Sequence, residues 1–175
     1  MTTAVTNLDL HDIARSSRTF GLQGYFVVTP IEEQHRLLGR ILGHWHKPQS
    51  QEYHPKRFEA LSLIQLTRDF EGVKQEILRK HGELPEVVLT DARRVRESVS
   101  YSQLRHELEA SGRSRPLVIV FGTGWGVSDT FYPEVHRILA PVYGPEGDQE
   151  SGGYNHLSVR AAAAIILDRL FGDRG

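Results

Sequence analysis

Residues 154–172 read YNHLSVRAAAAIILDRLFG and combine a polar beginning with an apolar, alanine-rich remainder. The remainder predicts a helix from Leu157 to Phe171, which Gly172 ends as a stop signal. Ser158 has the position and the side chain of a helix N-cap. A purely structural helix needs one capping residue, whereas this one begins with a crowd of polar side chains: Tyr154, Asn155, His156 and Ser158. The beginning of the helix is therefore a candidate for a binding role.

The rest of the chain alternates short apolar runs with longer amphipathic stretches, which predicts an α/β fold with a largely parallel sheet. The predicted strands are Tyr25–Val28, Leu63–Leu66, Val87–Leu89, Leu117–Phe121 and Ile138–Val142. The first predicted helix is capped by Asp9 and turns Ile13 and Ala14 inward. The others are Ile31–His44 with a stripe of Leu37, Leu38, Ile41 and Leu42, Asp69–Lys80 with Phe70, Val73, Ile77 and Leu78, and Ser102–Ala110 with Ser100 or Ser102 as its cap.

Three polar, glycine-containing loops follow the last three predicted strands. They read TDARRVRES (90–98), GTGWGVSD (122–129) and YGPEGDQESGGYNHLS (143–158). Ligands of open α/β sheets bind beyond the carboxyl ends of the strands. These three loops are therefore the predicted site.

Composition limits the classes of protein. The chain has 175 residues, no cysteine and a formal net charge of −1. This length favours one domain over 1–175. The absence of cysteine excludes disulfides and thiol catalysis and fits a cytoplasmic protein. No apolar run approaches the length of a membrane span, and the net charge argues against a protein that coats nucleic acid non-specifically.

The glycine loop Gly122–Gly126 leaves two interpretations open. It lacks the helix and the acidic partner of a dinucleotide fingerprint, and it lacks the Lys-Ser/Thr of a phosphate loop. Glycine allows close approach of the backbone to a ligand, but the same pattern is typical of a plain tight turn.

Two basic or histidine-containing segments are also ambiguous. Arg93, Arg94 and Arg96 form a cluster that either contacts RNA phosphates or is a solvated face. His44, His46 and nearby His54 are a candidate metal site, but the segment 43–57 has no acidic partner at ligand spacing, which favours a solvated loop and no metal. Lys56 and Arg57 add a smaller basic pair.

Several stretches together resemble the SPOUT methyltransferases. NLDLHDIARSSRTFG (7–21) is similar to their first motif, FGTGWG (121–126) to the second, and LAPVYG (139–144) with YNHLSVRAAAAIILDRL (154–170) to the last. The resemblance covers the chain from Thr2 onward. It is greatest to a bacterial family described as RNA methyltransferases, which occurs alone or fused to the tRNA (guanine-N1) methyltransferase.

The resemblance implies a parallel-sheet SPOUT fold whose C-terminal part forms a deep trefoil knot. It implies S-adenosylmethionine (AdoMet) bound among three knot loops, and a homodimer with each active site near the interface. The cofactor contacts that it implies are Thr90, Asp91, Ala92, Phe121, Gly122, Thr123, Gly124, Trp125, Gly126, Leu139, Pro141, Tyr154, Asn155, His156, Leu157 and Ser158. The implied RNA contacts are Arg93, Arg94 and Arg96.

The implied catalytic residues are Arg15, Asn155 and Ser158, with Arg15 supplied near the partner's pocket. The chain departs from the superfamily pattern at Asp9 and at His156, where Asn is common. The family also has a strand before the first motif that this chain lacks, so we expect either a five-stranded sheet with an unfilled position or a shifted N-terminus that covers it.

The resulting functional prediction is an AdoMet-dependent methyltransferase that acts on tRNA or rRNA by SN2 methyl transfer. A non-catalytic AdoMet- or RNA-binding dimerisation module is the alternative. A third interpretation, which follows from the glycine loop alone, is a nucleotide-binding α/β protein that transfers no methyl group.

Overall fold

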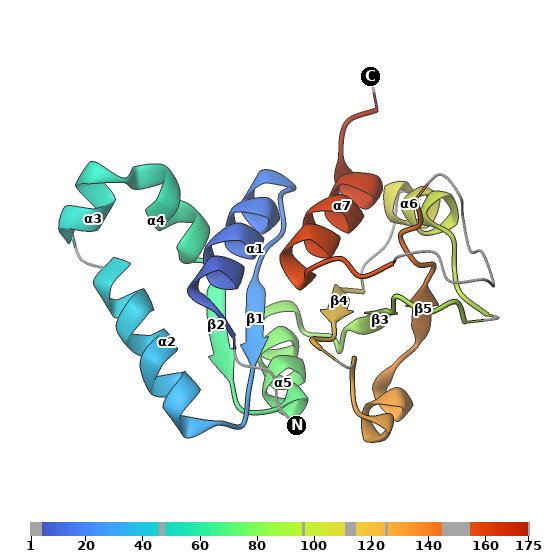
Figure 1. Cartoon of the computed structure of the whole chain (residues 1–175), viewed down its shortest axis with the longest axis horizontal. Coiled ribbons are helices and arrows are strands. Elements are labelled where there is room, and N and C mark those ends of the chain that lie inside the picture. The colour runs from blue at the N-terminus through green and yellow to red at the C-terminus, as the bar shows by residue number, and fades with distance from the viewer. Residues whose placement is uncertain are drawn as a thin grey trace. The chain divides into compact units, whose positions relative to one another are not determined.

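The structure is a computed structural model that describes residues 5–45, 48–95, 97–110, 115–124, 126–144 and 155–174. The chain divides into two compact units, Met1–Glu76 and Ile77–Gly175. Figure 1 shows the elements of both units. The single domain over 1–175 therefore stays a prediction.

The first unit consists of helices around a pair of parallel strands (Figure 1). Strands β1 and β2 pair in register from Tyr25 opposite Ile64 to Val28 opposite Thr67. Its elements are α1 (Asn7–Thr19), β1 (Tyr25–Val28), α2 (Glu32–Trp45), α3 (Pro48–Tyr53), α4 (Pro55–Leu61), β2 (Ile64–Thr67) and the first part of α5 (Phe70–His81).

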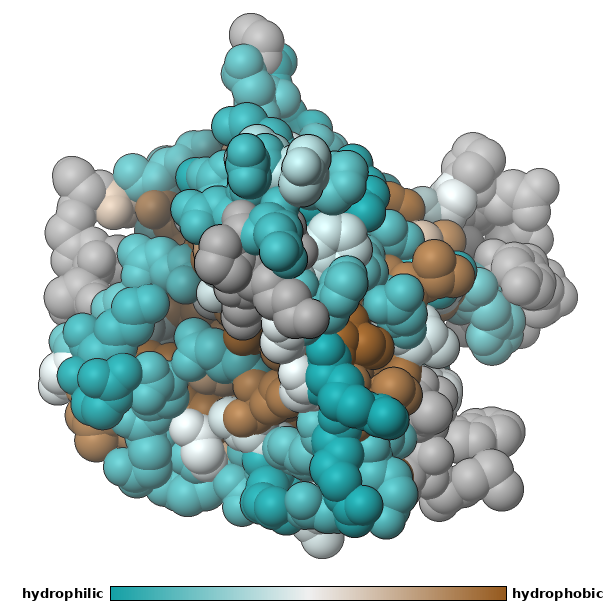
Figure 2. Space-filling view, turned by 90° about the vertical axis from the view of Figure 1, so that its left-hand side faces the viewer, coloured by the Kyte–Doolittle hydropathy of each residue, from teal (hydrophilic) through white to brown (hydrophobic). Residues whose placement is uncertain are grey.

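Apolar residues of α1, α2 and α4 close the core of this unit over β1 and β2. The core contains Leu10, Ala14, Val27, Leu38, Leu42, Ala60, Leu61 and Ile64. Ile13 and Ala14 of α1 are buried as predicted, and so are Leu38 and Leu42 of α2, whereas Leu37 of the predicted stripe is exposed. Seen from the side of α2 and α3, the surface is mainly hydrophilic, with hydrophobic side chains visible between the polar ones (Figure 2).

Two predictions for this unit were wrong. The N-cap of α1 is Thr6, not Asp9. Asp9 lies three residues further on and completes a capping box, in which its carboxylate accepts from the Thr6 backbone N–H. The segment 43–57 is not a solvated loop, because it contains α3 and the beginning of α4. Each of these helices begins with a proline, which the first turn of a helix tolerates.

The second unit is a three-stranded parallel sheet with strand order β4-β3-β5. Its elements are β3 (Glu86–Thr90), α6 (Tyr101–Glu109), β4 (Leu117–Phe121), the 3₁₀ helix η1 (Asp129–Glu134), β5 (Arg137–Leu139) and α7 (Val159–Phe171). Strand β5 is shorter than predicted. Pro141 lies in the predicted remainder, and proline has no N–H for a ladder.

Helices α6 and α7 pack together and cover the core of the second unit. Ile166 and Leu170 of α7 meet Leu104 of α6 and Val88 and Leu139 of the sheet. Across the same helix pair, the guanidinium of Arg169 lies over the ring of Tyr101, 4.9 Å from its centroid. The caps agree with two predictions, because Ser100 begins α6 and Gly172 ends α7.

The predicted α/β class with parallel pairing is confirmed. The described strands form two separate sheets, of two and three strands, rather than one five-stranded sheet. The deep trefoil knot stays a prediction. In the described part of the chain, no helix has the length and apolarity to cross a bilayer.

Candidate functional site

The carboxyl ends of β3, β4 and β5 lie side by side. Thr90, the last residue of β3, is the register partner of both Phe121 and Leu139. Its hydroxyl donates to the backbone oxygen of Val120 at 2.9 Å, which ties the ends of β3 and β4 together. The three predicted loops therefore leave the sheet from one edge, as parallel pairing requires.

The first loop is held by an ion pair within it. Asp91 Oδ1 accepts from the backbone N–H of Arg93 at 2.8 Å and from its Nε at 3.1 Å, while Oδ2 accepts from Nη2 at 2.9 Å. These bonds to Arg93 hold the pKa of Asp91 below its usual range, although partial burial opposes the shift. The Asp91 side chain is only 11% exposed, against 74% for Arg93.

This geometry separates the three arginines of the cluster. Arg93 fixes the loop and still shows much of its guanidinium to solvent, so it is more than a solvated charge. Arg94 is exposed, and Arg96 lies outside the described residues. The assignment of this cluster to RNA stays a prediction.

The segment before α7 reaches the first loop directly. Asn155 Nδ2 donates to the backbone oxygen of Ala92 at 2.8 Å, and the two residues are 63 apart in sequence. This bond joins the first and third loops above the sheet edge. It explains one of the polar side chains at the beginning of the helix.

Ser158 is the N-cap of α7, as predicted. Its hydroxyl accepts from the backbone N–H of Ala161 at 3.3 Å. His156, Leu157 and Ser158 are exposed, while Tyr154 lies outside the described residues. The other N–H groups of a first helical turn have no partner within the helix, so this end of α7 can donate to a ligand.

The glycine loop is a tight turn. The backbone N–H of Gly126 donates to Thr123 at 3.2 Å, and Gly124 and Gly126 have φ of 59° and 89°. A Cβ on Gly122 would lie 2.8 Å from the backbone of Gly126, which no side chain tolerates. The turn itself therefore requires glycine here. Trp125 lies outside the described residues, and a contact of this loop with AdoMet stays a prediction.

The predicted adenine wall is apolar and covered. Leu139 and Pro141 are both buried, and Leu139 belongs to the core beneath α7. Apolar walls with a few convergent polar groups are typical of cofactor sites. The side chain of Leu139 is fully buried, so a contact of Leu139 and Pro141 with the adenine stays a prediction.

Arg15 belongs to the first unit. It lies on α1 and is exposed, so its side chain is accessible to a large substrate. Its approach to the loops of the second unit, or to those of a partner subunit, stays a prediction.

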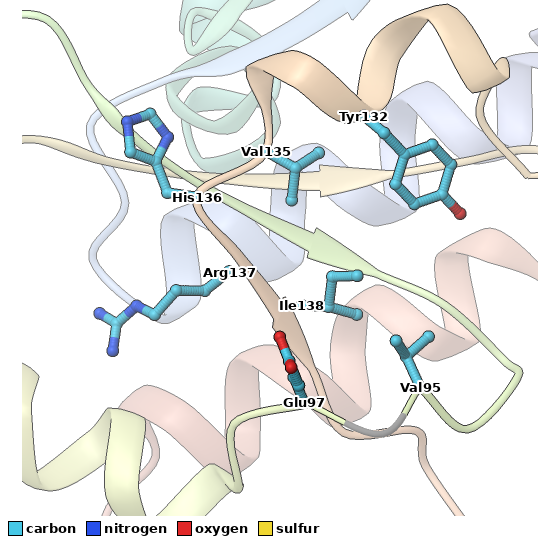
Figure 3. A pocket seen from close by; sticks show the side chains of 7 residues that line it. All are labelled: Val95, Glu97, Tyr132, Val135, His136, Arg137 and Ile138. Atoms are coloured by element: carbon cyan, nitrogen blue, oxygen red, sulfur yellow. The ribbon is translucent and has the colours of Figure 1, made fainter.

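Sequence reasoning missed a cavity of about 360 Å³ beside the first loop. Figure 3 shows the side chains around it, which come from the first loop and from the segment 132–138. They are Val95, Glu97, Tyr132, Val135, His136, Arg137 and Ile138. Arg137 is held by Glu86, 2.5 Å from its Nε, and by Glu107, so its charge is compensated. An arginine inside a short strand was the available signal, since such a charge requires partners.

Among the described residues, no group of three or more His, Asp or Glu side chains has the arrangement of a metal site. His44 and His54 instead surround the ring of Trp45. His46 lies outside the described residues.

The fold matches solved methyltransferases of the SpoU type. A putative methylase family protein from Neisseria gonorrhoeae aligns with a TM-score of 0.62 at 15% identity, over 99% of this chain and 87% of that one. The SpoU methyltransferase AviRb from Streptomyces viridochromogenes, in complex with the cofactor AdoMet, aligns with a TM-score of 0.55 at 15% identity, over 96% of this chain and 54% of that one. The architecture is therefore that of the SPOUT class of methyltransferases.

Sequence comparison gives the family. A family model described as SAM-dependent RNA methyltransferase matches residues 1–172, and the chain belongs to this family. Membership confirms the family that the sequence motifs resemble, and its description names AdoMet dependence and RNA methyl transfer.

Two relatives are similar over nearly the whole chain. An uncharacterized protein of Aquifex aeolicus is 40% identical over 169 residues, 97% of this chain and 78% of that protein. The tRNA (guanine-N(1)-)-methyltransferase of Nitratidesulfovibrio vulgaris is 44% identical over 171 residues, 98% of this chain. The chain spans only 38% of the length of that second relative.

Proposed function

We propose that this chain binds AdoMet at the carboxyl ends of β3, β4 and β5 and transfers its methyl group to RNA. The observation that carries the proposal is the hydrogen bond from Asn155 to Ala92, which brings the N-terminus of α7 onto the loop that follows β3. The strand ends beside it, at Thr90, Phe121 and Leu139, complete an edge to which three loops contribute.

Each part of this edge has a chemical role in the proposal. The amides at the start of α7 donate to the adenosyl group, with Ser158 holding the helix end in place. The tight turn 122–126 presents backbone groups to the amino-acid portion, and the backbone of the segment that contains Leu139 and Pro141 contacts the adenine. When bound, AdoMet supplies an activated methyl group on sulfur. The residues of the chain then align this group with an RNA nucleophile.

In this proposal, arginine side chains contact the RNA substrate. Arg93 is anchored by Asp91 with most of its guanidinium exposed, so it can meet a phosphate at low entropic cost. Arg94 lies next to it. Arg15 positions or activates the RNA, and we place it near the active site of a partner subunit in a two-fold homodimer.

Calorimetry with the purified chain tests the cofactor part. AdoMet should bind at one site per subunit, and Asn155→Ala should weaken it. Transfer of a labelled methyl group to total RNA from a strain that lacks the gene then tests the activity. Binding without transfer to any RNA would support the non-catalytic module, and absence of AdoMet binding would refute the proposal. Light scattering tests the dimer, and an AdoMet-binding monomer would contradict the shared site.

A further inference from the structure

A cluster of aromatic and cationic side chains in the first unit has no place in the site described above. Its centre is Trp45, the last residue of α2. The rings of His11, His44 and His54 stand edge-on around the indole, with centroids 5.4, 5.6 and 6.1 Å from it. The Arg57 guanidinium lies over the indole, 5.0 Å from the centroid. We call these five residues the Trp45 cluster.

Three separate helices supply the cluster. His11 comes from α1, His44 and Trp45 from the end of α2, and Arg57 from α4, which begins just after His54 (Figure 1). Trp45 also packs against the core of this unit, so a purely structural role explains its indole. It does not explain why three imidazoles and a guanidinium, rather than aliphatic side chains, surround that indole. His44, His54 and Arg57 are exposed.

Positive charge continues from the cluster along α1 and α4. Arg15 and Arg18 follow His11 at spacings of four and seven residues, which places them on one face of α1. Arg18 pairs with Glu59 of α4, and Lys56 pairs with the same carboxylate at 3.7 Å while remaining 95% exposed. The two helices together carry four cationic side chains and three acidic ones. The cations are Arg15, Arg18, Lys56 and Arg57. The acids are Asp12, Glu59 and Asp9, and Asp9 belongs to the capping box of α1.

The imidazole of His11 can act as an uncharged aromatic ring. Burial lowers its pKa from the usual value, and the neighbouring cations Arg57 and Arg15 lower it further, against the effect of Asp12. At neutral pH the ring is therefore uncharged. Neutral imidazole, indole and a planar guanidinium are all surfaces on which unpaired RNA bases stack.

We propose that the Trp45 cluster is an RNA-contact surface, on which an unpaired nucleotide of the RNA substrate stacks while Arg15, Arg18 and Lys56 contact its phosphates. The proposal rests on the proposed function, because it deepens how that function recognises RNA. Aromatic rings combined with an excess of cations match single-stranded RNA better than an acidic protein, for which stacking surfaces have no use.

The proposal gives Arg15 a second context. The resemblance assigns this residue to substrate positioning, and in the structure it lies one helical turn from His11 on the face of α1. A nucleotide held at the cluster would therefore leave neighbouring phosphates within reach of Arg15. This residue would then anchor RNA as well as position it, and the cluster determines which unpaired segment is held.

Exposed residues of the cluster give variants that leave the fold intact. The experiment uses the purified full chain and two probes, a single-stranded RNA oligonucleotide and total tRNA, with affinity measured at several salt concentrations. His54→Ala removes a stacking ring, and Lys56→Gln with Arg57→Gln removes charge. Arg36→Gln is the matched control, because Arg36 is an exposed arginine of α2, paired with Glu33 and nine residues before Trp45.

Each variant has a distinct expected result. His54→Ala should weaken single-stranded RNA about tenfold without changing the salt dependence, as loss of one stacked base does. Lys56→Gln with Arg57→Gln should reduce the slope of log affinity against log salt by about 0.7 for each phosphate that the variant no longer neutralises. Arg36→Gln should bind RNA with the affinity and salt dependence of the unmodified chain. The AdoMet affinity should be the same in all variants.

The outcomes separate this proposal from the proposed function. If the unmodified chain binds RNA and transfers methyl groups while every cluster variant matches it, the cluster proposal is wrong and the proposed function stands. Equal losses of affinity in Arg36→Gln and the cluster variants would also overturn it, because the surface would then act only through its general charge. A chain that binds neither RNA probe would overturn both.

Discussion

Asn155 donates its side-chain hydrogen bond to the backbone oxygen of Ala92, 2.8 Å away. A side chain that precedes one helix thereby fixes the backbone of a loop that follows a strand 63 residues earlier. The consequences of this bond and of four other features can be measured.

Removal of the Asn155 donor should weaken AdoMet binding about two- to tenfold, the effect of a net hydrogen bond of about 0.5–1.5 kcal/mol. Asn155→Asp keeps the shape but cannot donate, so it should behave like Asn155→Ala. Calorimetry on both variants provides the check. If Asn155→Asp binds AdoMet like the unmodified chain, the bond to Ala92 does not organise the site.

The tight turn should not tolerate a side chain at its first glycine. In Gly122→Ala the new Cβ meets the backbone of Gly126, and we expect a loss of about 1–3 kcal/mol in the free energy of unfolding. Gly144→Ala is the matched control, since nothing lies within 4 Å of its Cβ. Chemical denaturation of both measures the difference, and equal stabilities would mean that the turn relaxes at no cost.

Replacement of the α7 cap separates its structural from its binding role. Ser158→Ala should cost about 1 kcal/mol in the free energy of unfolding, because the Ala161 N–H loses its acceptor. Ser158→Thr keeps the hydroxyl and should recover most of this stability. Ser158→Asp also keeps an acceptor for the helix end but has no hydroxyl. If the hydroxyl contacts substrate, methyl transfer should fall in Ser158→Asp although stability is retained, and equal activity of Ser158→Asp and the unmodified chain would mean that Ser158 acts only as the cap.

The pair Asp91–Arg93 should make stability depend on pH in the acid range. The pKa of Asp91 is lowered in the folded protein, mainly by Arg93, so the pair stabilises fully above the unfolded value of about 3.9. This contribution is lost as the pH falls through the folded pKa. Arg93→Gln should raise the pKa of Asp91 in an NMR titration and remove the contribution at pH 7. An unchanged Asp91 titration in this variant would contradict the pairing.

His11 should produce a second pH dependence nearer neutrality. Its pKa is lowered by burial and by Arg57, so the unfolded chain takes up the proton first as the pH drops below about 6.5. Stability should therefore fall across this range as the pH decreases. In Arg57→Gln the pKa of His11 should rise toward its usual value and the fall should shrink. Denaturation curves at pH 7.5 and pH 5.5 measure this loss of stability, and an identical loss in Arg57→Gln and the unmodified chain would exclude an effect of Arg57 on the pKa of His11.

Sequence patterns predicted the elements whose residues are continuously apolar. The bounds of β1 and β4 match because Tyr25–Val28 and Leu117–Phe121 are uninterrupted apolar runs. Helices α3 and α4 were not predicted, because Pro48 and Pro55 suggested breaks in the chain and because short helices show little hydrophobic periodicity. Tertiary packing, which the local pattern does not contain, decided these segments.

The location of the candidate site at the strand ends could be predicted from the sequence, but the hydrogen bonds within it could not. Parallel strands bring their carboxyl ends to one edge, so the three loops were located from strand positions alone. Two interactions depend on the backbone conformation of the loops, which residue types do not specify. They are the hydrogen bond from Asn155 to Ala92 and the bidentate ion pair between Asp91 and Arg93. The same holds for the tight approach of Gly122 to Gly126.

The separation between Ala92 and Asn155 also bears on the order of events during synthesis. The ribosome adds Asn155, whose side chain fixes the loop at Ala92, only 63 residues after Ala92 itself. Closing so long a loop costs entropy that only docking of the following helix against the sheet repays. A growing chain can therefore complete its strands β3 to β5 before Asn155 is available to fix the loop that follows β3.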